Sequence, residues 1–233
     1  MAMTDLSLPQ ALLLLSLDDT TGAKRHGSTL GYGVAGATLA ELALSGRIRL
    51  RVQTDRLGPF TSNRSWVDVV DASPTDLPSC DAMLAEMASG KTRSPKAWVE
   101  KMHRRLVGTV TDELVDRGVL RRETTTVLGA FPMTRYPQLD PRPEAELRAA
   151  LEAVVRGELP PTDRLAALAA LAEATGSLKG VVPGLRGRAR KARIQQLGEG
   201  EWGSEAAREA IQAAAAAAAA VIAVASAGGD GSS

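Results

Sequence analysis

The residue types that most often carry enzymatic chemistry are scarce in this sequence. Its 233 residues include two histidines, His26 and His103, and one cysteine, Cys80. Each histidine has arginine beside it and lacks a further His, Cys or carboxylate at metal-ligand spacing, and Cys80 has no obvious base to activate its thiol. A single cysteine also excludes a disulfide framework. We therefore predict that the protein is not an enzyme and uses no metal and no cofactor.

A glycine-rich segment, Gly31 to Gly36, matches the G-x-G-x-x-G dinucleotide fingerprint, and Asp55 lies about where the ribose-binding acid should be. That fingerprint requires the first glycine to end a strand, so that the phosphate meets a helix N-terminus. Here the preceding apolar run ends at Leu17, well before Gly31. We interpret these glycines as small residues that allow close packing between helices.

Basic clusters are the remaining chemical signal. Two small groups are Lys24-Arg25-His26 and Arg104-Arg105. A larger group lies between Glu173 and Glu199, a segment that contains no acidic residue. It consists of Lys179, Arg186, Arg188, Arg190, Lys191 and Arg193. Such clusters are either a solvated face or an anion site. The formal net charge of +1 and the few aromatic residues argue against nucleic acid as the partner. An anionic membrane surface fits better, because each surface Lys or Arg contributes about 1 kcal/mol there.

The hydrophobic pattern predicts a mainly α protein, a single helical domain over residues 1–227 with a small β-hairpin and short antiparallel strands. A disordered tail is expected at 228–233. Helices are predicted at 8–17, 30–44, 81–89, 95–117, 143–156, 163–175, 185–197 and 204–226. Strands are predicted at 47–52 and 66–70, and the arms of a hairpin at 119–122 and 126–128, before an extended connection marked by Pro132 and three later prolines. The start lacks the basic region of a signal peptide, so we expect a cytoplasmic protein.

Local signals support several of these boundaries. Ser7 and Gln10 form a capping-box pattern, and Ser94-Pro95 is a strong helix start. The segments LAELALSGRIRLR and VTDELVDRGVLRRE share a helix, a stopping glycine and a short basic strand. The alanine-rich run at 213–225 is shorter than the roughly 20 residues of a membrane span, so we predict a packed terminal helix.

One alternative uses the same elements to bind DNA. The helix at 95–117, the turn at Gly118 and the strands to Leu128 resemble the recognition helix and wing of a winged-helix module. Arg104 or Arg105 would then contact DNA. Against this, no tight helix–turn–helix precedes Ser94, and the chain is not basic overall.

Four segments resemble the Golgi phosphoprotein 3 family in the same order and spacing: LSLPQALLLLSLDDTTG, TLAELALSGRIRL, LVDRGVLRRE followed by FPMTRYP, and DRLAALAALAEATGSL. The similarity covers residues 5–225. It implies a mainly α-helical domain and a non-catalytic protein on membrane surfaces, which in eukaryotic members recognises phosphatidylinositol 4-phosphate through a basic pocket. It also implies a hairpin at 119–131 that supports self-association or membrane contact, with Leu128 and Phe131 as the expected contact residues.

The resemblance also suggests where a lipid head group would bind. The LAELAL segment places His26 where the family has its head-group tryptophan and Ala35 where it has an arginine. The LVDRGVL segment places Arg104 on one pocket arginine and Val107 on the second. Two of the four expected contacts are therefore apolar in this chain.

We accordingly expect Arg104 to be the main phosphate contact, with His26, Arg25 and Arg105 in support. A shift of one residue in the register would place His103 or Arg105 there instead. The expected partner is an anionic phospholipid or phosphoinositide on the cytoplasmic face of a membrane. The alternative is an adaptor of the same fold that binds client proteins through the helix at 185–197 and the hairpin, and homo-oligomers through the hairpin are a further expectation.

Overall fold

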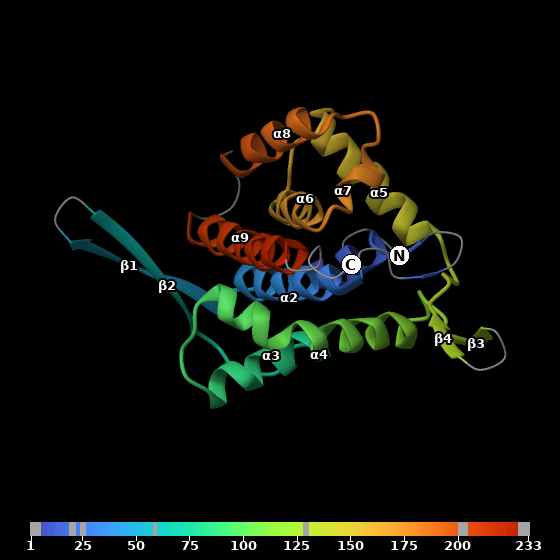
Figure 1. Cartoon of the computed structure of the whole chain (residues 1–233), viewed down its shortest axis with the longest axis horizontal. Coiled ribbons are helices and arrows are strands. Elements are labelled where there is room, and N and C mark those ends of the chain that lie inside the picture. Colours follow the sequence, from blue (N-terminus) through green and yellow to red (C-terminus); the bar gives the residue numbers. More distant parts are fainter. Residues whose placement is uncertain are drawn as a thin grey trace.

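The computed structural model describes residues 6–18, 22–23, 27–57, 60–127, 131–199 and 205–227 (Figure 1). The helices are α1 (Leu8–Leu14), α2 (Gly27–Leu44), α3 (Pro78–Ser89), α4 (Pro95–Asp116), α5 (Arg142–Arg156), α6 (Asp163–Thr175), α7 (Leu178–Val181), α8 (Gly187–Glu199) and α9 (Glu205–Ala227). The strands are β1 (Ile48–Leu57), β2 (Phe60–Val69), β3 (Glu123–Val127) and β4 (Phe131–Arg135). They form two antiparallel two-stranded sheets, β1–β2 and β3–β4. The predicted mainly α fold is confirmed.

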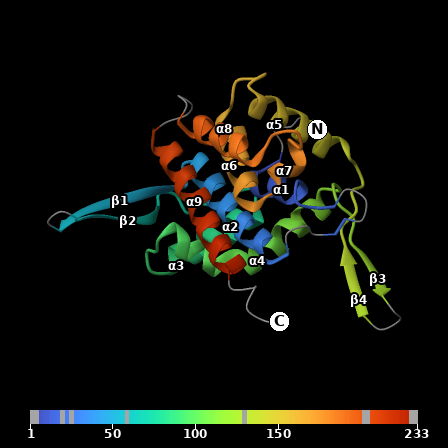
Figure 2. The ribbon, with the colours of Figure 1, turned by 45° about the horizontal axis from the view of Figure 1, so that its top comes forward.

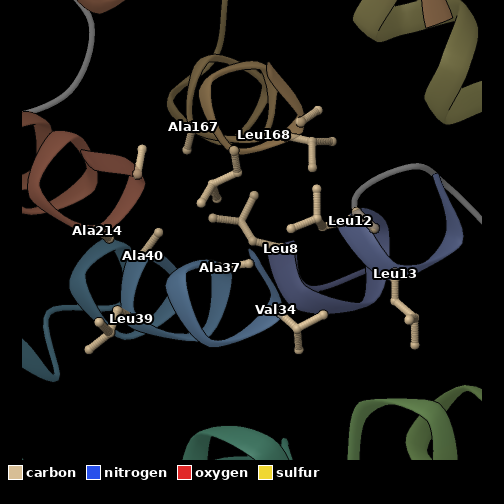
Figure 3. Close-up of a cluster of buried hydrophobic side chains, with 14 of the residues drawn as sticks. Leu8, Leu12, Leu13, Val34, Ala37, Leu39, Ala40, Ala167, Leu168 and Ala214 are labelled. Atoms are coloured by element: carbon tan, nitrogen blue, oxygen red, sulfur yellow. The ribbon is translucent and has the colours of Figure 1, made fainter. Parts of the chain in front are cut away.

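Helix α2 lies at the centre of the fold. Helices α1, α4, α6 and α9 all contact it. Figure 3 shows Ala37 of α2 facing the cluster formed with Leu8 and Leu12 of α1 and Leu168 of α6. Residues 33–43 of α2 are buried without interruption. A helix that is apolar on all sides has to be enclosed in this way, because it has no polar face to offer to water.

The glycines of the fingerprint segment lie inside α2 and not at the end of a strand. They are places where neighbouring elements approach α2 closely. A Cβ atom added to Gly33 would lie 2.2 Å from Cγ2 of Thr175, and one added to Gly36 would lie 2.9 Å from Cβ of Ala218. One added to Gly31 would lie 2.8 Å from the carbonyl oxygen of His103. The packing interpretation of this segment is therefore confirmed.

The predicted helix starts are also observed. The Ser7 N–H donates to Oε1 of Gln10 at 3.2 Å, which forms one half of the capping box. The Ser94 hydroxyl accepts a hydrogen bond from the Ala97 N–H at 3.3 Å. These contacts satisfy backbone groups that a helix leaves without partners at its ends.

The two echoing segments end their helices with the same backbone geometry. Gly46 has φ = 70° and Gly118 has φ = 69°, in the left-handed region that favours glycine. In each case the next residue donates its N–H back into the helix at 2.9 Å, from Arg47 to the Leu42 carbonyl and from Val119 to the Leu114 carbonyl. This is the hydrogen bond of a Schellman-type helix end.

A buried glutamate stands five residues before each of these glycines. Glu41 accepts a hydrogen bond from the Leu8 N–H at 2.7 Å, at the N-terminus of α1. Glu113 accepts one from the Ser79 N–H at 2.6 Å, in the first turn of α3. A carboxylate is favourable at a helix N-terminus, where unpaired N–H groups carry positive partial charge. The sequence echo therefore marks two carboxylates that each dock another helix.

The prediction for the second hairpin is wrong in its position. The segment 119–122 is not an arm of the hairpin, and the only pairing described there is an isolated bridge between Leu120 and Gln138. Leu120 is buried in the core, with 1% exposure. This burial holds the segment at the base of the hairpin and keeps it out of the projecting strands. Pro132, expected in an extended connection, lies in β4 opposite Thr126. A two-stranded sheet consists of edge strands, where proline is tolerated.

The alanine-rich segment lies in α9, which packs against α2, α4 and α6. Ile211, Ala214, Ala218 and Val221 are buried there. The prediction of a packed terminal helix is confirmed. Among the described residues, no helix combines the length and apolar character needed to cross a membrane. The tail at 228–233 lies outside the described residues.

Candidate functional site

Arg104 lies near the middle of α4 with an exposed side chain. It forms no ion pair with any residue that the structure describes. One turn further along the same helix is Gly108, and a Cβ atom added there would meet nothing within 4 Å. The surface beside Arg104 is therefore open, and its guanidinium is available to an anion.

Arg105 is directed to a different side of α4, because successive residues of a helix lie about 100° apart. Its Nη1 atom lies 3.5 Å from Oε1 of Glu86 on α3. Lys101 also binds the Glu86 carboxylate, and this hydrogen bond is the main reason why the pKa of Glu86 lies below its ordinary value. Arg105 is thus already engaged with an acid, whereas Arg104 is not.

An aromatic contact joins α2 to α4 next to Arg104. The rings of Tyr32 and His103 stack with centroids 4.2 Å apart and planes inclined by 27°. Nδ1 of His103 lies 2.8 Å from the Glu100 carbonyl, so it donates to that carbonyl when it carries the ring proton. Tyr32 was not among the predicted site residues, since nothing in the sequence links it to a histidine 71 positions later.

Arg25 and His26 lie outside the described residues, so their expected role stays a prediction. In the sequence they directly precede α2, which begins at Gly27. The first turns of α2 lie against α4, as shown by the close approach of Gly31 to the His103 carbonyl.

The two family positions occupied by apolar residues do not provide phosphate contacts. Ala35 is 0% exposed in the interior of the fold. Val107 is half-buried and packs against the core. Neither side chain carries a hydrogen-bond donor, so a head group at Arg104 has fewer partners here than the family pattern implies.

The hairpin contact residues are not placed by the structure. Leu128 lies outside the described residues. Phe131 begins β4, but its side chain is outside the described part. The β3–β4 hairpin itself extends from the body at the end where α4 finishes (Figures 1 and 2). Contact between copies through this hairpin remains a prediction.

The basic cluster of α8 is partly structural. Arg190 binds Glu173 of α6, and both side chains are largely buried. Nε of Arg193 donates to the Val155 carbonyl at 3.0 Å, near the C-terminus of α5, where a cation is favourable. These two arginines attach α8 to its neighbours. The other members of the cluster are exposed: Lys179, Arg186, Arg188 and Lys191.

An apolar cavity of about 490 Å³ lies between the start of α1, helix α5 and the start of α6. Leucine side chains form most of its wall, and Arg164 stands at one side. The Arg164 guanidinium already binds the Glu41 carboxylate at 2.8 and 2.9 Å and the Leu6 carbonyl at 3.0 Å. The cavity therefore does not offer an unpaired cation to an anionic ligand. Within the described ranges, no group of His, Cys, Asp and Glu is arranged to hold a metal ion.

The fold and the site define a mainly α-helical protein with a largely buried central helix, two projecting β-ribbons and an exposed arginine on the helix between them. Residues 8–214 match the model of the Golgi phosphoprotein 3 (GPP34) family, and the chain belongs to that family. The family assignment made from the sequence is confirmed. A comparison with curated proteins gave no match.

Proposed function

We propose that this protein is non-catalytic and binds anionic phospholipid head groups at a membrane surface, with Arg104 as the main phosphate contact. The observation that carries the proposal is the state of Arg104, which is exposed, beside open space, and without an acidic partner in the described part of the chain. Guanidinium is well suited to phosphate, because it offers several N–H donors in a planar fork and is always charged.

The start of α2 supports an anion at this place. Its first turn contains no acidic residue, so its positive end is not neutralised from within the helix. The sequence directly before α2 is Lys24-Arg25-His26. Family membership adds support, since the resemblance implies that other members bind membrane lipids through a basic pocket in this region.

The head group is expected to be selected by charge more than by shape. Ala35 and Val107 stand where the family pattern has arginines, and each hydrogen bond to a charged group contributes about 1.5–3 kcal/mol. The loss of two such contacts weakens discrimination between a phosphoinositide and other anionic lipids. We therefore propose anionic phospholipids as the ligand class, with phosphatidylinositol 4-phosphate as one member to be tested.

Vesicle co-sedimentation tests this proposal. The protein is mixed with neutral vesicles, with vesicles containing phosphatidylglycerol, and with vesicles containing phosphatidylinositol 4-phosphate. Arg104→Ala is expected to lower the affinity for anionic vesicles at least tenfold, from the loss of about 1.5–3 kcal/mol. The matched control is Arg188→Ala, since Arg188 is exposed and lies on α8, a helix on the side of the body away from α4 (Figure 1). An unchanged affinity in Arg104→Ala would remove the proposed site.

The exposed cations of α8 favour a second candidate, a protein adaptor. The side chains of Arg186, directly before α8, and of Arg188 and Lys191 on it are exposed. Capture of a specific partner in the absence of lipid, insensitive to salt, would support this function. The winged-helix alternative stays a prediction, and a mobility-shift assay with duplex DNA at moderate salt tests it.

A further inference from the structure

The β1–β2 ribbon extends away from the helical body at the end opposite the β3–β4 hairpin (Figures 1 and 2). Its strands pair from Ile48 with Val69 at the base to Leu57 with Phe60 at the far end. Ten residues of strand span about 33 Å. The base is tied down, for example by the Val67 N–H, which donates to the Arg93 carbonyl at 2.9 Å. A two-stranded ribbon alone in water is only marginally stable. The outer part of this ribbon would therefore be stabilised by contact with a further surface.

One face of this ribbon combines arginine with tryptophan. The pairs Arg49 with Asp68 and Arg51 with Trp66 are two residues apart along the strands and therefore share a face. The Arg51 guanidinium lies 5.1 Å from the centre of the Trp66 ring, and that of Arg64 lies 5.9 Å from it. We call Arg49, Arg51, Arg64 and Trp66 the Arg–Trp face.

The Arg–Trp face concentrates positive charge in a chain that is nearly neutral. It carries three arginines, and the aspartate that lies beside them is Asp68, whereas the net charge of the whole chain is +1. Asp68 binds Nε of Arg51 at 2.8 Å, and this hydrogen bond holds the pKa of Asp68 below its ordinary value. The carboxylate is therefore ionised at neutral pH, and it attracts both Arg51 and Arg49, so one acid faces several cations on this face.

We propose that the Arg–Trp face of the β1–β2 ribbon is a second contact with the anionic membrane surface, separate from the head-group site at Arg104. This inference rests on the proposed function. Tryptophan is favoured at the interface between lipid and water, and each arginine near an anionic surface contributes about fivefold in affinity. Arginine held over the Trp66 ring places both groups at the same level of the surface.

The position of the ribbon favours a membrane over a small ligand or a nucleic acid. The N-cap of helix α4, Ser94, directly follows Arg93, whose carbonyl binds the base of the ribbon. Arg104 lies ten residues after Ser94, which corresponds to about 15 Å along the helix. An extended surface can contact two sites this far apart, whereas a single small anion cannot. Single-stranded nucleic acid stacks its bases on open aromatic rings, but the Trp66 ring already has two guanidinium groups against it.

Tryptophan fluorescence tests the contact directly. The full chain carrying Trp202→Phe retains Trp66 and Trp98, and Trp98 is 1% exposed and serves as a constant background. Mixed with vesicles of phosphatidylglycerol and brominated phosphatidylcholine, this variant is expected to show quenched emission, and adding Trp66→Phe should abolish the quenching. Emission that stays unquenched while the protein co-sediments with the vesicles would overturn the proposal.

A pair of double variants separates this inference from the proposed function. Arg49→Ala with Arg64→Ala is expected to lower the affinity for anionic vesicles about 30-fold, at about fivefold for each arginine. Arg186→Ala with Arg188→Ala, at the start of α8, removes the same charge and is expected to have little effect. Equal losses in both pairs would mean that binding follows net charge, and would overturn the inference. A loss in Arg104→Ala with normal binding in the ribbon pair would also overturn it while leaving the proposed function in place. If the wild-type chain binds no anionic vesicle, both fail.

Discussion

At the scale of single residues, Cys80 illustrates how burial decides the chemistry of a side chain. It is a free cysteine with 1% exposure. Burial raises the pKa of its thiol far above the ordinary value, and the carboxylates of Glu41, Glu113 and Asp81 raise it further. The thiolate is the reactive form of cysteine, so at neutral pH this residue carries almost none of it. The structure thus gives a physical reason for treating Cys80 as part of the core.

We expect Cys80 to resist a chromogenic thiol reagent in the native protein at neutral and mildly alkaline pH. Both its burial and its raised pKa oppose the reaction. After unfolding in guanidinium chloride the same thiol should react completely, which serves as the control. Rapid labelling of the native protein would show that the region around α3 opens readily.

At the scale of elements, buried carboxylates and helix-packing glycines hold the helices in register. Glu113 on α4 accepts hydrogen bonds from the Ser79 N–H of α3 and, at 3.0 Å, from Nε2 of Gln10 on α1. One side chain thereby connects three helices. Gly33 and Gly36 keep α2 close to its neighbours, as their missing Cβ atoms leave room for Thr175 and Ala218.

Glu113→Ala is expected to destabilise the protein by about 2–4 kcal/mol, because it leaves two buried donors without partners. Urea-induced unfolding measures this loss. Asp112→Ala is the matched control, since Asp112 is exposed and pairs with Arg122 at the surface, where an ion pair contributes about 0–1 kcal/mol. Similar small losses in the two variants would mean that Glu113 does not hold the helices together.

Gly33→Ala is expected to destabilise the fold by about 1–3 kcal/mol, the usual cost of adding a methyl group to a closely packed interior. The new Cβ atom would lie 2.2 Å from Thr175, so one of the helices has to move. Gly108→Ala on α4 adds the same methyl group into open space, and there alanine should stabilise the helix by up to about 1 kcal/mol. Thermal unfolding of both variants checks the pair, and equal shifts in Tm would contradict the packing role.

At the scale of the whole molecule, α4 lies between the bases of the two β-ribbons, which extend to opposite sides (Figures 1 and 2). Arg104 is near the middle of that helix. Helix α8, which carries exposed cations, lies on the other side of the body. The molecule therefore offers two separate basic regions, and our proposals assign the membrane to the region around α4 and β1–β2.

Binding to anionic vesicles should weaken steeply as salt is raised, since charges near a surface are screened within a Debye length of about 8 Å at physiological ionic strength. We expect a loss of about 2 kcal/mol of binding free energy between low and high salt, because each of two or three arginines contributes about 1 kcal/mol at an anionic surface. Co-sedimentation at several salt concentrations measures it, with the urea unfolding curve as a control for folding. Binding that ignores salt would favour the adaptor function.

The sequence by itself determined the class of fold, the family and most helix boundaries. Helix α6 was predicted at 163–175 and is found there, and α4 begins at Pro95 as expected. These boundaries depend on caps, prolines and glycines, whose effects reach only a few residues along the chain. The exposure of the Arg104 side chain was also predictable, because Arg104 is a charged residue on the polar side of an amphipathic helix.

Tertiary structure alone decided the contacts between segments that are distant in the sequence. The stacking of Tyr32 on His103, the engagement of Arg105 with Glu86 and the burial of Ala35 all depend on which helices become neighbours. The same holds for the second hairpin, whose position was set by the burial of Leu120 in the core. Local patterns specify an element through its own backbone, whereas the partners of a side chain are selected by the packing of the whole chain.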